Sequence, residues 1–247
     1  MAVNRTTTER TALVTGASRG IGAGIARHLL DRGVRVAGTY RSSLENMEKL
    51  AAMHPDQVLP MHLDLARPET TLSAVEEVRM QWGRLDSLVL NAAVWHGGRL
   101  AKIDPDTWWS VIEANLRSTA ALARAAIPML VDGENPSILL VGSVVGVVGF
   151  PGDTAYASAK AAAVGFARSL AKELAPKGVR VNVLAPGFVE TDMTAAVPET
   201  SRHKIASETP LGRFGTVDEI ARAAVFLSED ATFCTGAVLA ADGGWSL

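Results

Sequence analysis

Thr15-Gly-Ala-Ser-Arg-Gly-Ile-Gly22 directly follows a short apolar run that begins at Ala12, and it precedes a helical pattern over residues 23–31. Glycines let a backbone turn tightly, so this stretch predicts a sharp turn between a strand and a helix. A strand followed by a helix is the repeating unit of parallel sheets. The stretch therefore predicts the first unit of an α/β fold.

The rest of the chain repeats this alternation of apolar runs and helical patterns. The runs are 12–15, 34–38, 58–63, 87–90, 138–141, 179–183 and 237–240. Seven short strands, most of them followed by a helix, predict a doubly wound parallel seven-stranded sheet with helices on both faces. Glycine and proline are scattered and mark no linker, so we expect a single domain over residues 1–247.

Composition excludes several classes of partner. Lys and Arg number 24 against 26 Asp and Glu, and a net charge of −2 gives no field that would hold a nucleic acid. The longest apolar run, 138–150, is too short to span a bilayer, and residues 1–10 lack the apolar core of a signal peptide or anchor. The lone Cys234 cannot form an internal disulfide, which fits a reducing cytoplasm. The histidines show no metal-ligand spacing, so we expect no metal.

The glycine-rich turn has the features of a phosphate site. The helix that follows it offers free N–H groups and the positive end of its dipole. Its spacing is G-x-x-x-G-x-G, not the strict G-x-G-x-x-G, and a turn without a ligand remains the alternative. We favour dinucleotide binding, through Gly16, Ser18, Arg19, Gly20, Ile21 and Gly22.

The end of the second strand indicates which dinucleotide. NAD sites usually place Asp or Glu there to bond the ribose 2′-hydroxyl, but this chain reads Thr39-Tyr40-Arg41. Arg41 and Arg19 are suited to hold a 2′-phosphate through forked hydrogen bonds. NADP(H) is therefore preferred, with NAD(H) and solvated arginines as the alternatives.

Two later strand ends add candidates. Asp64-Leu65 follows the third strand, within reach of an adenine ring, and Asn91-Ala92 follows the fourth, along a ribose. Both pairs are equally consistent with ordinary turn residues.

The pair Tyr156 and Lys160 has the spacing of one helical turn in an alanine-rich stretch. An ammonium close to a phenol favours the phenolate and lowers its pKa, which would make a proton donor. A solvated surface pair is the alternative. Ser143 ends the fifth strand at the same sheet edge, where its hydroxyl would polarise a carbonyl.

These motifs together resemble the short-chain dehydrogenase/reductase family, and within it the 3-oxoacyl-(acyl-carrier-protein) reductases. The resemblance covers nearly the whole chain and rests on Thr15-Gly-x3-Gly-x-Gly22, Asn91-Ala92, Glu113-Ala-Asn115-Leu, Gly142-Ser143, Tyr156-x3-Lys160, the stretch 185–194 and Asp242-Gly-Gly244. It implies a Rossmann fold, reduction of a ketone with NADPH, and a homotetramer.

The resemblance also implies roles for single residues. Tyr156 donates the proton, Ser143 bonds the same oxygen, Lys160 lowers the tyrosine pKa and bonds the nicotinamide ribose, and Asn115 positions a water that links Lys160 to solvent. Pro186, Gly187, Val189 and Thr191 would border the nicotinamide. Trp95, His96, Phe188, Val145 and Ser143 would line the substrate pocket, under a mobile lid at about 188–210.

Two departures from the family pattern limit the expected substrate. The turn after the fourth strand reads Leu90-Asn91-Ala92-Ala93 instead of Asn-Asn-Ala-Gly. Glu134 stands in the loop where the family's fatty-acid reductases present basic residues to an acidic carrier protein. We expect a 3-oxoacyl thioester or another small-molecule ketone, with carrier docking an open question. The alternatives are an alcohol or polyol dehydrogenase, a ketoreductase of a specialised pathway, and a non-catalytic nucleotide sensor.

Overall fold

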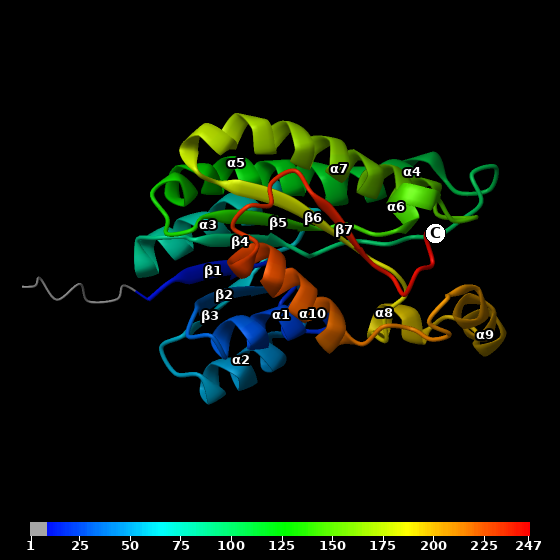
Figure 1. The fold of residues 1–247 in the computed structure, drawn as a ribbon, viewed down its shortest axis with the longest axis horizontal. Coiled ribbons are helices and arrows are strands. Elements are labelled where there is room, and N and C mark those ends of the chain that lie inside the picture. Colours follow the sequence, from blue (N-terminus) through cyan, green and yellow to red (C-terminus); the bar gives the residue numbers. More distant parts are fainter. Residues whose placement is uncertain (1–8) are drawn as a thin grey trace, which may run out of the picture.

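The computed structural model describes residues 9–247, which build one parallel sheet between two layers of helices (Figure 1). Its strands are β1 (Thr11–Val14), β2 (Arg35–Tyr40), β3 (Val58–His62), β4 (Ser87–Leu90), β5 (Ser137–Val141), β6 (Arg180–Pro186) and β7 (Val238–Ala241). They run in the order β3-β2-β1-β4-β5-β6-β7, and every neighbouring pair is parallel. The predicted seven-stranded fold is confirmed.

The two helix layers follow from alternation along the strands. Leu13 faces one core and Ala12 and Val14 face the other, because successive side chains of a strand point to opposite faces. The first core lies under α3 (Pro68–Trp82), α5 (Ser118–Val131) and α7 (Thr154–Leu174), and the second under α1 (Gly20–Leu30), α2 (Leu44–Met53) and α10 (Val217–Val225). Burial on both faces explains why the strands read as continuous apolar runs.

The strand order reverses between β1 and β4. From β1 the chain crosses to β2 on one side, whereas β4 leads to β5 on the other. Open parallel sheets bind ligands at such a point, beyond the carboxyl ends of the strands. The residues that follow β1 and β4 are Thr15 and Asn91, so both predicted turns meet at the place where a ligand is expected.

Several short elements surround this edge. α6 (Val145–Val148) follows β5 and packs on α7, as does α4 (Pro105–Ile112), which continues through a π-helical turn (Glu113–Arg117) into α5. A 3-10 turn (Ala175–Lys177) ends α7, and a π-helical turn (Phe226–Asp230) ends α10. A π turn inserts one residue into a helix, and such turns occur often at functional sites.

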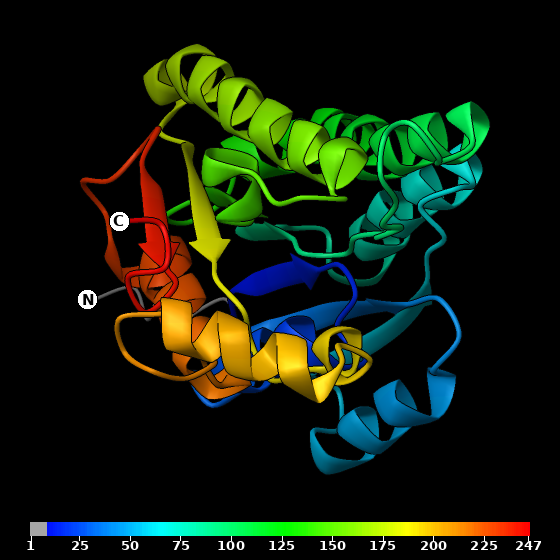
Figure 2. The same cartoon turned by 90° about the vertical axis from the view of Figure 1, so that its right-hand side faces the viewer.

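The segment predicted as a lid contains two helices. α8 (Asp192–Ala195) and α9 (Glu199–Glu208) project from one end of the molecule in Figure 1, and Figure 2 shows them in front of the sheet, between α7 and α2.

The structure tests the expectations about the N-terminal segment and about membrane helices only in part. Residues 1–8 lie outside the described part, so the expectation of no signal or anchor within residues 1–10 stays a prediction, as does the single domain over 1–247. Among residues 9–247, no helix combines the length and apolar character needed to cross a bilayer.

Candidate active site

The glycine-rich turn between β1 and α1 is held in a conformation that requires glycine. Gly16 and Gly20 have φ angles of +68° and +54°, in the left-handed region. Gly16 N–H donates to Thr39 Oγ1 at 3.0 Å and Ala17 N–H to the Thr39 carbonyl at 2.8 Å, which ties the turn to β2. The first turn of α1 holds no acidic side chain, so its N–H groups remain suited to an anion.

Gly22 lets the turn and the end of β4 approach each other. A Cβ at Gly22 would lie 2.2 Å from the Gly16 carbonyl oxygen and 2.5 Å from Asn91 Nδ2. Asn91 Nδ2 donates to the Thr15 carbonyl at 2.8 Å, and the Asn91 and Ala92 N–H groups both donate to Thr15 Oγ1 at 2.9 Å. The side chain of Asn91 thus braces the turn, and Gly22 acts through packing.

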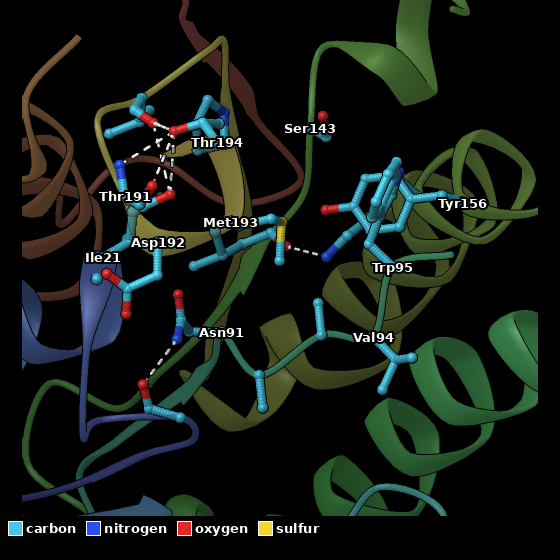
Figure 3. A pocket seen from close by; sticks show the side chains of 18 of the residues that line it. Ile21, Asn91, Val94, Trp95, Ser143, Tyr156, Thr191, Asp192, Met193 and Thr194 are labelled. Atoms are coloured by element: carbon cyan, nitrogen blue, oxygen red, sulfur yellow. Dashed lines mark hydrogen bonds between the residues drawn. The ribbon is translucent and has the colours of Figure 1, made fainter. Parts of the chain in front are cut away.

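The strand ends open into a cavity of about 790 Å³ (Figure 3). Its lining includes most of the predicted site residues, namely Gly16, Ser18, Arg19, Gly20, Ile21, Tyr40, Arg41, Asp64, Leu65, Asn91, Ala92, Trp95, Ser143, Val145, Tyr156, Lys160, Pro186, Gly187, Phe188, Val189 and Thr191. Figure 3 shows Ser143, Tyr156 and Trp95 towards one end and Ile21, Asn91 and Thr191 towards the other. One cavity thus joins the predicted phosphate turn to the predicted proton donor.

Three predicted residues lie elsewhere. Gly22 packs behind the turn, and His96, which was expected in the substrate pocket, is exposed and does not line the cavity. Asn115 is buried in the π turn, where Nδ2 donates to the Val94 and Val111 carbonyls at 2.7 and 2.8 Å. Its Oδ1 accepts from the Val94 N–H at 3.1 Å. Since these bonds occupy the amide, the side chain of Asn115 braces the segment after β4.

The two arginines differ in their surroundings. Arg19 forms a long ion pair of 3.5 Å with Asp192 at the start of α8, and both side chains are largely exposed. Arg41 is exposed directly after β2, and within residues 9–247 no carboxylate pairs with it. An exposed pair at this distance contributes little, so both guanidinium groups remain free to take an anion from the cavity.

Lys160 is buried, with 7% of its surface exposed. Its Nζ donates to the Val141 carbonyl at 2.8 Å and lies 5.4 Å from the centroid of the Tyr156 ring. Burial lowers the pKa of Lys160 to about 8, so the protonated form still predominates at pH 7. The surface-pair alternative is excluded.

Tyr156 departs from the sequence prediction. Burial, and after it the negative charge of Asp153, raise the pKa of the Tyr156 phenol, whereas Lys160 was expected to lower it. The expected direction is wrong for this structure because the ammonium is turned to the Val141 carbonyl, and desolvation disfavours the phenolate. Tyr156 is consequently protonated at neutral pH.

Ser143 is positioned by the end of β5. Its Oγ accepts a hydrogen bond of 3.2 Å from the Val145 N–H, which leaves its own O–H free to donate. A Cβ at Gly146 would lie 2.8 Å from Lys160 Cβ, so glycine there allows α6 to pack closely on α7. This packing brings the strand end that bears Ser143 against the helix that bears Tyr156.

Phe150 and Phe188 line the cavity, and Phe188 belongs to a cluster of aromatic rings. Phe188 packs against Phe150, Trp245 and Phe214, with ring centroids 5.8, 5.3 and 5.7 Å apart. Sequence reasoning identified Phe188 alone, because the other rings come from three separate segments. It also missed Asp153, a carboxylate that lines the cavity, although Asp153 precedes Tyr156 by three residues and so shares its side of the helix start. Within residues 9–247, no group of three or more His, Cys, Asp or Glu is arranged to hold a metal.

The chain is similar to a family model and to curated proteins that are all described as reductases of acyl-carrier-protein substrates. The family model described as enoyl-(acyl carrier protein) reductase matches residues 16–246. The 3-oxoacyl-(acyl-carrier-protein) reductase FabG of Salmonella typhimurium is 40% identical over 236 residues, covering 94% of this chain and 96% of that protein. FabG of Thermotoga maritima is 37% identical over 238 residues, covering 95% and 97%.

A solved structure agrees in fold. A blue fluorescent protein from a metagenomic library, in complex with NADPH, superposes with a TM-score of 0.89 at 33% identity, covering 96% of this chain and 98% of that one. With the motifs in place on the sheet edge and relatives matched over nearly their full lengths, the chain belongs to the short-chain dehydrogenase/reductase family.

Proposed function

We propose that this protein is an NADPH-dependent reductase that converts a ketone, most suitably the ketone of a 3-oxoacyl thioester, to a secondary alcohol. The observation that carries the proposal is the joint lining of one cavity by the glycine-rich turn, Ser143 and protonated Tyr156. The FabG relatives are named as 3-oxoacyl reductases, and the structural neighbour was solved with NADPH, in agreement with this assignment.

The residues of the cavity fit a dinucleotide. Gly16 and Gly20 have no side chain that would keep a phosphate from the backbone at these two positions, and the start of α1 offers N–H groups without a competing carboxylate. Arg19 and Arg41 would hold the 2′-phosphate of NADPH, and Asp64 and Leu65 would border its adenine. Pro186, Gly187, Val189 and Thr191 would border the nicotinamide. When bound, NADPH supplies the hydride.

The protein groups supply the proton and the orientation. Ser143 donates a hydrogen bond to the ketone oxygen and Tyr156 transfers its proton to that oxygen, so the product is an alcohol and the enzyme is left with a phenolate. Because the Tyr156 pKa is raised, the donor state is fully populated at neutral pH before substrate binds. Lys160 stabilises the phenolate, and a proton from solvent restores the phenol. Donation of this kind typically contributes ~100- to 10,000-fold.

The substrate assignment has two enzymatic competitors. The family model's description names enoyl reduction, which reduces a carbon–carbon double bond. The pair of hydroxyl donors at Ser143 and Tyr156 favours a carbonyl oxygen, because an oxygen that gains negative charge is stabilised by such donors. Alcohol or polyol oxidation uses the same groups in reverse, and it requires Tyr156 as the phenolate. A non-catalytic sensor would not need the hydroxyl groups of Ser143 and Tyr156.

The proposal also concerns the thiol that carries the acyl group, which is either a carrier protein or a small molecule. Glu134 is exposed and lies 3.8 Å from Arg84, in the loop before β5. An acidic carrier protein would be repelled there. We therefore favour a small thioester or coenzyme A thioester over a carrier-bound one. The proposal also retains a cytoplasmic homotetramer, which light scattering after size exclusion would test.

The experiment is an NADPH-oxidation screen with matched substrates. Acetoacetyl and crotonyl thioesters of the same thiol distinguish ketone from enoyl reduction, and cyclic and aromatic ketones distinguish specialised ketoreductases. We expect the acetoacetyl thioester to be reduced and the crotonyl thioester to be untouched. Oxidation of NADPH by the crotonyl thioester alone would overturn the assignment, and no turnover with any substrate despite NADPH binding would favour the sensor.

A further inference from the structure

The carboxylate of Asp153 lines the cavity on the same side as the proton donor. Asp153 immediately precedes α7, the helix that carries Tyr156, and occupies the position that caps a helix. Aspartates at such positions commonly accept a hydrogen bond from the first turn, which is worth ~1 kcal/mol. Here the side chain makes no such bond. The carboxylate is turned away from its own helix.

Asp153 is instead held by the segment that follows β4. Trp95 Nε1 donates to Asp153 Oδ1 at 3.0 Å, and the Gly98 N–H donates to the Gly152 carbonyl at 2.8 Å. A Cβ at Gly97 would lie 2.7 Å from the Trp95 ring, so the indole rests directly on the backbone. Two hydrogen bonds and this packing fix the carboxylate in place at the cavity wall.

The second oxygen of this carboxylate has no partner. Among residues 9–247 no group donates to Asp153 Oδ2, although the residue is half-buried and burial raises the pKa of its carboxyl. Among residues 9–247, Lys160 is the only cation that lines the cavity near Tyr156, and its Nζ already donates to the Val141 carbonyl. The lining of the cavity also includes apolar side chains, among them Val94, Val145, Phe150, Phe188 and Met193.

A fixed, partly desolvated carboxylate that lines a binding cavity discriminates between substrates by charge. A carboxylate accepts N–H and O–H donors and repels anions, and both effects grow as water is removed. We propose that Asp153 is a specificity-determining residue, whose free oxygen accepts a hydrogen bond from an N–H or O–H donor on the arm of the ketone substrate and whose charge rejects substrates that place a negative charge next to it. This rests on the proposed ketone reduction.

Two thioesters of acetoacetate with short arms test the proposal. The N-acetylcysteamine thioester carries an amide N–H, and the 2-mercaptoethanesulfonate thioester carries a permanent negative charge at a similar distance from the ketone. The ratio of kcat/KM values for the two is measured with NADPH in the wild type and in Asp153→Asn. Asparagine keeps an oxygen for Trp95 and places an N–H where the free oxygen was. We expect the wild type to favour the amide arm by at least tenfold, and this ratio to fall at least tenfold in the variant.

Two further variants make the outcome decisive. Asp153→Ala removes the charge without adding a donor and should give an intermediate ratio. Asp192→Asn removes the other carboxylate beside the cavity, at the arginine end, and should keep the wild-type ratio. A variant that still reduces the amide-arm thioester is folded. A ratio that stays within twofold of wild type in both Asp153 variants would overturn the role of Asp153 and leave ketone reduction intact. Failure of the wild type to reduce either thioester would instead count against the proposed function.

Discussion

Lys160 Nζ donates its hydrogen bond to the Val141 carbonyl at 2.8 Å and lies 5.4 Å from the centroid of the Tyr156 ring. The ammonium therefore sits beneath the phenol and is anchored to the end of β5. The sequence predicted that a contact between Lys160 and Tyr156 lowers the tyrosine pKa and so makes the proton donor. In the structure the two residues have separate roles. The tyrosine is kept as an acid by burial, and the lysine is held ready to stabilise the phenolate that proton transfer leaves behind.

Replacing Tyr156 with Phe removes the proton donor while keeping the ring. We expect kcat for acetoacetyl thioester reduction to fall roughly 100- to 10,000-fold, since an aliphatic hydroxyl is a much weaker acid than a phenol and cannot replace it as the proton donor. NADPH binding, followed by the fluorescence of the dihydronicotinamide, should be nearly unchanged. Turnover close to that of the wild type would remove Tyr156 from its role as the acid.

Replacing Ser143 with Ala removes the second donor to the ketone oxygen. Loss of one such donor typically lowers kcat by ~100- to 1,000-fold. Threonine keeps the hydroxyl, so Ser143→Thr should retain more activity than Ser143→Ala, and steady-state kinetics on the two variants makes the comparison. Equal activity of both would show that the hydroxyl is dispensable.

Lys160 gives a pH dependence of stability whose sign follows from its lowered pKa. The folded protein releases this proton near pH 8 and the unfolded chain near 10.5, so between these values the folded state binds fewer protons and its stability rises with pH. Lys160→Met lacks this contribution. We expect the free energy of unfolding of the wild type to gain about 2 kcal/mol on the variant between pH 7 and 9.5. Urea titrations at both pH values measure it, and a gap between the two proteins that does not change with pH would contradict it.

Arg41 is the exposed cation placed to distinguish the two nicotinamide cofactors. Arg41→Asp should weaken NADPH binding at least tenfold and leave NADH binding unchanged or improved, because the new carboxylate repels a phosphate and accepts a ribose hydroxyl. Arg27→Asp, on the outer side of α1, is the matched control and should change neither affinity. An unaltered NADPH to NADH ratio in Arg41→Asp would exclude Arg41 from the phosphate site.

Gly22 tests the packing behind the turn. In Gly22→Ala the new Cβ meets the Gly16 carbonyl oxygen at 2.2 Å, far inside contact distance, so the turn must move. We expect NADPH affinity to fall at least tenfold and the midpoint of thermal unfolding to drop. Wild-type values for both would show that the turn relaxes without cost.

The sequence alone determined the strand and helix pattern, the seven-stranded sheet and the position of most of the cavity. These features follow from local periodicity and from the rule that ligands lie at the carboxyl ends of parallel strands. Both can be applied to the sequence of residues alone. The glycine turn, Ser143 and Tyr156 could therefore be placed at one edge without coordinates, although the turn is far from the other two residues in the chain.

Only the tertiary structure decided where the charges and polar groups of that edge point. The amide of Asn115 is used up by the Val94 and Val111 backbone, His96 faces solvent, and Lys160 bonds the Val141 carbonyl. Asp153 turns from its own helix to Trp95, 58 residues away in sequence. The pKa of a side chain depends on burial and on neighbours brought together by folding, and spacing along one helix does not reveal these. The four-residue spacing of Tyr156 and Lys160 thus indicated the reaction, while the fold set the protonation state of each group.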